Sequence, residues 1–142
     1  MEEVKVIEHY YLPKTINILG TKYEFKILWV SEAYDTDADA KKLADNGLAG
    51  YHDGYEKKIV ISSLDDYKYH PQFANASFNC KLQSIKEIIR HEIVHAFLDE
   101  SGLKQESDSK DIPWQRNEVC VDWIAIQSPK MFKVFKECNL LD

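Results

Sequence analysis

The chain has 142 residues, of which 44% are hydrophobic and 30% charged, and its formal net charge is −6 at pH 7. This length predicts a single domain over residues 1–142, and this balance is typical of a folded protein rather than a disordered one. The negative charge argues against a nucleic-acid partner, and no apolar run reaches the roughly 20 residues that cross a bilayer. The first residues lack the pattern of a secretory signal, and the three cysteines have no close pairing. We therefore expect a cytoplasmic protein without a membrane partner.

Two hairpins are predicted in the N-terminal half. Within residues 15–30, a Gly-Thr pair separates two runs rich in β-branched and aromatic residues. Within residues 48–61, an Asp-Gly pair separates two further strand-like arms. The second of these arms, Lys58–Ser62, is short, and we expect it to lie at or near a sheet edge.

Helices are predicted mainly after the hairpins. A polar segment, residues 31–47, ends in Asn-Gly and favours a short helix over the alternative of an acidic loop, while residues 63–79 should form an irregular connection. The longest helix should begin at a capping box formed by Ser84 and Glu87 and end at Gly102. Two more helices should follow, one from Asp111 to about Gln127 and one from Ser128-Pro129 to about Cys138. Strands followed by helices predict an α+β fold, with a small, mostly antiparallel sheet packed against the long helix and one or two C-terminal helices.

The sequence HEIVH at residues 91–95 has the HExxH pattern and lies on the longest predicted helix. At about 100° per residue, His91 and His95 lie roughly 40° apart and one turn separated, so both imidazoles can reach one ion. Glu92 projects toward the same side, where it can accept a proton from a water bound to Zn2+. The pattern therefore predicts two zinc ligands and a general base. The alternative is that both histidines are ordinary helix residues, one buried and one solvated.

A catalytic zinc site needs a third protein ligand and one position open to water. Glu118 and Asp122 lie one turn apart in the next predicted helix, in an apolar stretch where an unpaired carboxylate is costly to bury. We predict that Glu118 is the third ligand and that Asp122 accepts the far ring N–H of a ligating histidine. The alternative is a solvated face, or an ion pair with Arg116 or a lysine.

Other carboxylates compete for the third position. Asp99 lies one turn beyond His95, but a straight helix would hold it past the ion. Glu100, Glu106 and Asp108 lie in or near a polar loop and are expected to be solvated. No histidine follows His95, so the metzincin arrangement with three histidines is absent and a His2Glu site is favoured.

The HExxH motif, followed by Asn117-Glu118 and Asp122, resembles the gluzincin arrangement of metallopeptidases. Its short spacing after a hairpin-rich half is similar to the ImmA/IrrE-type and phage-encoded metallopeptidases. The resemblance covers residues 84–125 and implies a minimal zincin-like fold, in which His91, His95 and Glu118 hold the metal. It implies Glu92 as general base and Asp122 as the supporting acidic residue. Members of this family are small cytosolic proteases, some of which cleave repressor or regulator proteins of phage or mobile-element origin.

The sequence thus predicts a zinc-dependent peptidase acting on a protein or peptide substrate, and it leaves the oligomeric state open. The rival interpretation is a non-catalytic zinc-binding or partner-binding domain that keeps a zincin-like fold. A peptide is expected to add as a strand to the Lys58–Ser62 arm. The donor that stabilises the oxyanion stays open among four side chains, Tyr51, His52, Tyr55 and His70. For His52, the simpler interpretation is a surface turn residue.

Overall fold

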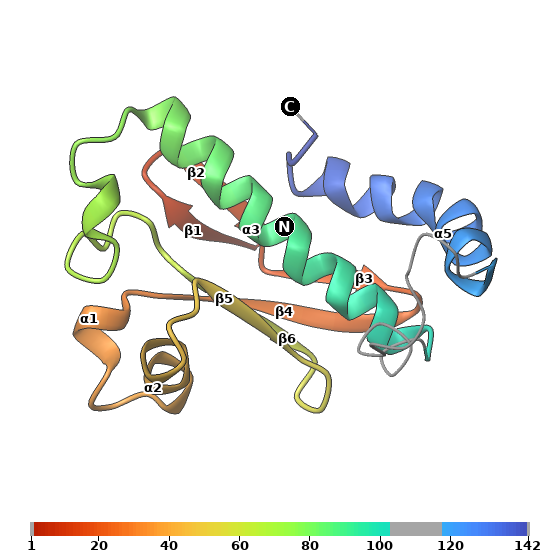
Figure 1. Ribbon diagram of the computed structural model, residues 1–142, viewed down its shortest axis with the longest axis horizontal. Helices are drawn as coiled ribbons and strands as arrows, with labels where there is room; N and C mark the ends of the chain where they lie inside the picture. The colour runs from red at the N-terminus through yellow and green to blue at the C-terminus, as the bar shows by residue number, and fades with distance from the viewer. Residues whose placement is uncertain (1, 103–117, 142) are drawn as a thin grey trace.

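The computed structural model describes residues 2–102 and 118–141 (Figure 1). The strands in these residues are β1 (Glu3–Ile7), β2 (Tyr10–Pro13), β3 (Thr15–Ile18), β4 (Thr21–Leu28), β5 (Gly50–Asp53) and β6 (Lys58–Ser62). The helices are α1 (Val30–Ala33), α2 (Ala38–Asp45), the 3-10 helix η1 (Pro71–Phe73), α3 (Phe78–Glu100) and α5 (Glu118–Glu137). Strands precede the long helices, which confirms the predicted α+β class.

Both predicted hairpins form, and a third hairpin of β1 and β2 was not predicted. The four-stranded sheet has the order β3-β4-β6-β5, in which β4 and β6 are parallel and the other pairs antiparallel. The expectation that Lys58–Ser62 lies at an edge was wrong, because this segment is β6 and lies between β4 and β5. Its apolar run Ile59–Ile61 is buried throughout, as is typical of an internal strand with both faces covered. The open edge on this side of the sheet belongs to β5.

Alternate residues of β6 face opposite layers of the molecule. Ile59 and Ile61 belong to one core with Ile89 of α3, whereas Val60 packs with Leu43 of α2. Because successive strand residues point to opposite faces, α3 covers one face of the sheet and α2 covers the other (Figure 1).

The long helix α3 begins earlier than predicted. Ser77 is its N-cap and accepts a hydrogen bond from the Cys80 backbone N–H, so Ser84 lies inside the helix instead of starting it. Residues 78–83 contain no glycine or proline, and nothing in them stops the helix from extending back to the earlier serine. The predicted end is correct, because Gly102 follows the helix with a φ of 80°.

The C-terminal helix α5 continues through Pro129, so the predicted restart at that residue was wrong. A proline removes one backbone hydrogen bond of the helix, which a helix packed against its neighbours can tolerate. The predicted start at Asp111 lies outside the described residues. Val134 and Phe135 of α5 belong to the same core as α3. No helix in residues 2–102 and 118–141 is both long and apolar enough to span a bilayer.

Candidate metal centre

The two histidines of the HExxH motif converge, as predicted, on one side of α3. Nε2 of His91 and Nε2 of His95 lie 3.1 Å apart. Their ring centroids are 4.7 Å apart and the rings are inclined at 74°. A spacing of four residues on a continuous helix produces this convergence without help from any other element.

This geometry fits a zinc ion. Zinc binds histidine nitrogen at about 2.0–2.1 Å in a tetrahedral arrangement, which separates two ligand nitrogens by about 3.3 Å. The observed separation of 3.1 Å is close to that value. Imidazole nitrogen is also a donor that zinc prefers, so the pair fits the predicted ion by chemistry and by spacing.

Glu92 is the most buried of the three polar residues in the motif, with 7% of its surface exposed. Burial raises the pKa of its carboxyl to about 7, against the opposing effect of a hydrogen bond from the backbone of His52. This bond ties the middle of α3 to the edge strand β5. A cavity of about 370 Å³ lies here, lined by His91, Glu92 and the segment Gly47–Gly50. The carboxyl therefore lies beside a groove that contains one of the two imidazoles.

His52 lies against His95, although its interpretation as a surface turn residue gave no reason to expect this. The two rings stack with 2° between their planes and 5.4 Å between their centroids. Only 13% of the His52 side chain is exposed, and its Nε2 lies 3.6 Å from Oδ2 of Asp99. The sequence gives only a weak indication of this contact, namely that His52 alternates with Gly50 in a strand-like arm. The packing of β5 on α3 is what brings His52 to the motif.

Asp99 takes a place against the turn between β5 and β6. A side-chain carbon added to Gly54 would lie 1.7 Å from Oδ2 of Asp99, so the carboxylate could not keep this place beside a larger residue. Asp99 is thus held near His52 and one turn beyond His95.

The other expected neighbours lie elsewhere. Glu100 is not solvated as predicted: its carboxylate accepts hydrogen bonds from Thr21, Tyr23 and Lys57 at 2.7–2.8 Å, and 13% of its side chain is exposed. This carboxylate joins the end of α3 to the strands. Glu106 and Asp108 lie outside the described residues.

Three of the four side chains considered for the oxyanion lie away from the motif. The Tyr51 hydroxyl donates to Asp39 on the α2 side of the sheet. Tyr55 is 97% exposed, and His70 Nε2 lies 2.8 Å from Oγ of Ser62. Of the four, only His52 contacts a histidine of the motif.

The third ligand stays a prediction. α5 begins at Glu118, but the side chains of Glu118 and Asp122 lie outside the described part of the structure, as does Arg116. Among the side chains that are described, no group of three or more histidine, cysteine, aspartate or glutamate residues is placed to hold a metal. A complete site therefore needs a ligand beyond His91 and His95.

Comparison of the chain with protein families, curated proteins and solved structures found no match. The assignment of a function therefore depends on the geometry of this site. That geometry combines two converging imidazoles, a buried carboxyl held by a neighbouring strand, and a groove beside them. With a third ligand, this arrangement would suit a divalent ion and the transfer of a proton next to it.

Proposed function

We propose that this protein is a zinc-dependent peptidase, in which His91, His95 and Glu118 hold the ion and Glu92 is the general base. The observation that carries the proposal is the 3.1 Å approach of the two Nε2 atoms beside a carboxyl that is nearly inaccessible to solvent. Burial of an ionisable group next to two convergent metal ligands has a cost in stability, and functional sites are where such groups concentrate. Asp122 is proposed as the residue that orients a ligating histidine.

In this proposal the chain's own residues supply the proton transfers. Zinc, when bound, lowers the pKa of a coordinated water and polarises the scissile carbonyl. Glu92 accepts the proton of the attacking water while the new C–O bond forms, and returns it to the amine nitrogen as the C–N bond breaks. A pKa near neutrality suits a group that must both accept and release a proton. The backbone of His52 holds the carboxyl in position for both steps.

The edge strand β5 is the proposed place for the peptide backbone. Ala49 pairs with Ser62 of β6 through its carbonyl, so the backbone groups of Gly50, the next residue, point away from β6 toward the open edge. Gly50 also lines the groove beside His91 and Glu92. An extended peptide that adds to this edge would lie along the motif. This replaces the earlier expectation for Lys58–Ser62, which lies inside the sheet.

Metal content and peptide hydrolysis test the proposal together. The wild-type protein should contain about one zinc per chain and cleave members of a random peptide mixture. Glu92→Gln should keep its zinc and lose at least about a hundredfold in turnover, which is the usual contribution of general-base catalysis. Glu118→Ala should lose zinc on dialysis against a weak chelator. The matched control is Glu32→Gln, an exposed glutamate that does not line the groove, which should change neither measurement.

The outcomes separate the rival interpretations. A wild-type protein that binds no zinc would overturn the proposal, and so would full turnover by Glu92→Gln. Full retention of zinc by Glu118→Ala would show that the third ligand is wrongly assigned. Stoichiometric zinc without hydrolysis of any peptide would favour the non-catalytic zinc-binding domain instead.

A further inference from the structure

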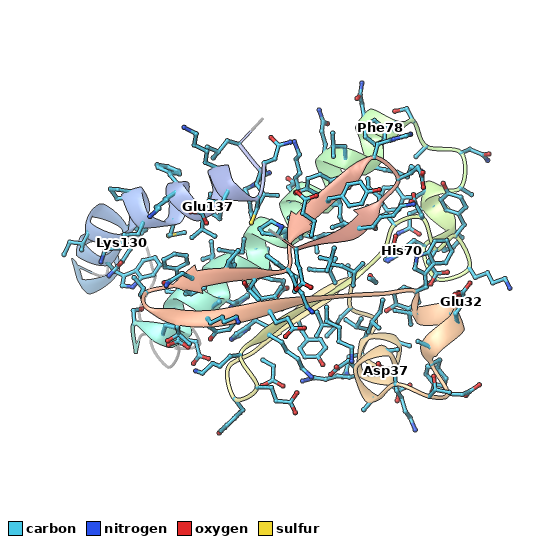
Figure 2. The ribbon with its side chains drawn as sticks, turned by 180° about the vertical axis from the view of Figure 1, so that it is seen from behind. Glu32, Asp37, His70, Phe78, Lys130 and Glu137 are labelled. Carbon is cyan, nitrogen blue, oxygen red and sulfur yellow. The ribbon has the colours of Figure 1, made fainter. Side chains whose placement is uncertain are left out.

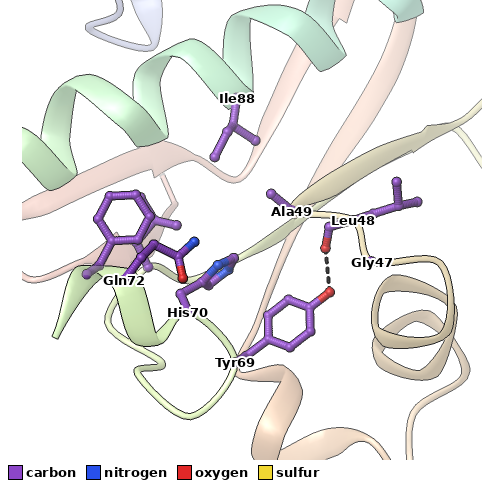
Figure 3. A pocket seen from close by; sticks show the side chains of 9 residues that line it. Gly47, Leu48, Ala49, Tyr69, His70, Gln72 and Ile88 are labelled. Carbon is purple, nitrogen blue, oxygen red and sulfur yellow. Dashed lines mark hydrogen bonds between the residues drawn. The ribbon is translucent and has the colours of Figure 1, made fainter.

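A second cavity, of about 310 Å³, adjoins the groove at the HExxH motif (Figure 3). Both cavities are lined by Gly47, Leu48, Ala49 and Ile88, so they are neighbours along one face of α3. The second cavity extends toward the irregular segment that precedes α3. That segment contributes four lining residues, Tyr69, His70, Gln72 and Phe73.

The walls of this cavity are held by hydrogen bonds. The Tyr69 hydroxyl donates to the carbonyl oxygen of Leu48 at 2.6 Å, which joins the segment before α3 to the segment before β5 (Figure 3). His70 Nε2 lies 2.8 Å from Ser62 Oγ, and the Tyr69 and His70 rings pack edge to face at 4.7 Å. The cavity is therefore formed before any ligand binds.

No aspartate, glutamate, lysine or arginine lines this cavity among the residues that the structure describes. Burial lowers the pKa of His70 below its usual 6.5, so its ring is neutral at pH 7. A charged side chain would lose its water here without gaining a partner, which is costly. The lining therefore favours an uncharged guest, whose apolar atoms can pack on Leu48, Leu64, Phe73 and Ile88.

The position of the cavity relates it to the proposed reaction. Ile88 precedes His91 by three residues on α3, which corresponds to about 4.5 Å along the helix axis. An extended peptide advances about 3.3 Å per residue. A side chain that enters the cavity beside Ile88 would then belong to a residue one or two positions from the bond cleaved at the metal.

The cavity also lies away from α5. His70 lies at the opposite end of the molecule from Lys130 of α5 (Figure 2).

The size of the cavity limits what it can hold. A volume of 310 Å³ is at the small end of the range for ligand sites, and it suits one large side chain rather than a whole ligand of drug size.

We propose that this cavity is a specificity pocket, which receives a large, uncharged, apolar side chain of an extended peptide substrate. Leucine, methionine and phenylalanine are the residue types that fit this chemistry. The residue would stand one or two positions from the scissile bond, at a fixed offset. This inference rests on the proposed peptidase function, and it adds the class of substrate.

Cleavage of a peptide mixture, mapped by mass spectrometry, tests the pocket. Zinc-loaded wild type should prefer leucine, methionine or phenylalanine over alanine at one fixed offset by about tenfold or more. Gln72→Trp should narrow the pocket from its rim and reduce this preference at least fivefold. Asn75→Trp is the matched control: it is exposed on the same segment, does not line the cavity and should leave the preference unchanged.

Binding to the zinc-loaded Glu92→Gln protein gives a readout that does not need turnover. Fluorescence anisotropy of labelled peptides should show the same preference, and Gln72→Trp in that background should remove it. Hydrolysis by wild type without preference at any offset would overturn the pocket and leave the peptidase standing. Selective binding that Gln72→Trp removes, without any hydrolysis, would support the pocket and overturn the peptidase. Neither binding nor hydrolysis of any peptide would overturn both.

Discussion

Replacing Gly54 by alanine would push the Asp99 carboxylate out of its place against the β5–β6 turn. The added carbon would lie 1.7 Å from Oδ2, whereas ordinary contact begins at 3.4 Å, so the oxygen has to withdraw by about 1.7 Å. The same oxygen lies 3.6 Å from Nε2 of His52, and that approach would be lost. We expect Gly54→Ala to lower the free energy of unfolding by about 1–2 kcal/mol, as overpacking does.

The double variant of Gly54 and Asp99 isolates the contact between the two residues. Once Asp99→Ala has removed the obstructing carboxylate, Gly54→Ala should be neutral, or should stabilise by up to about 1 kcal/mol because alanine restricts the unfolded chain. Gly54 does not have a positive φ, so the backbone itself accepts alanine. The expected coupling between the two positions is therefore about 2 kcal/mol.

Urea unfolding of the four proteins, with EDTA present to exclude metal effects, measures this coupling. Gly20→Ala is the control: its φ of 93° makes alanine strained, and nothing lies within 4 Å of the added carbon. It should destabilise equally with and without Asp99. If Gly54→Ala has the same cost in both backgrounds, the contact with Asp99 is not what requires glycine there.

Three further predictions follow from buried or stacked side chains. Because burial lowers the pKa of His70, folding disfavours protonation of its ring. The free energy of unfolding should therefore be highest above pH 6.5 and fall at lower pH. In urea unfolding between pH 7.5 and 5.5, His70→Gln should flatten this decline. Glu100→Gln should cost about 2 kcal/mol of unfolding free energy because a partly buried carboxylate loses charged hydrogen bonds, whereas Glu8→Gln on the surface should leave the urea midpoint nearly unchanged. In a chelator competition, His52→Ala should weaken zinc binding about tenfold, whereas His52→Phe, which keeps a flat ring on His95, should retain the wild-type affinity. An equal loss of zinc affinity in both variants would refute the stacking role.

The α+β class and two hairpins could be predicted because each depends on neighbours in sequence. A Gly-Thr or Asp-Gly pair between two runs of strand-forming residues pairs those runs through local turn geometry. The hairpin of β1 and β2 was not predicted, because its turn, Glu8-His9, contains no glycine, asparagine or aspartate, although His9 takes a positive φ of 66° there. The start of α3 was also wrong, because Ser77 and Ser84 are both competent caps, and no local rule chooses between them.

The place of Lys58–Ser62 was decided by a contact that no local pattern contains. Its edge position was expected from its shortness, but α1 and α2 return the chain so that β6 pairs with β4 in parallel, Phe25 opposite Ile59. Parallel pairing needs a long crossover connection. The residues of the two strands do not indicate which strand such a connection will bring alongside. The apolar run at residues 59–61 was a usable signal for an internal strand.

The convergence of His91 and His95 follows from their spacing in the sequence, because a separation of four residues on any continuous α-helix brings two side chains together. The surroundings of the two histidines depend on how the elements pack: the backbone of His52 on Glu92, the ring of His52 on His95, and the cavity between Tyr69 and Ile88. These contacts join α3 to residues far from it in the chain. They depend on the order of the strands in the sheet, which the spacing of residues within one element does not encode.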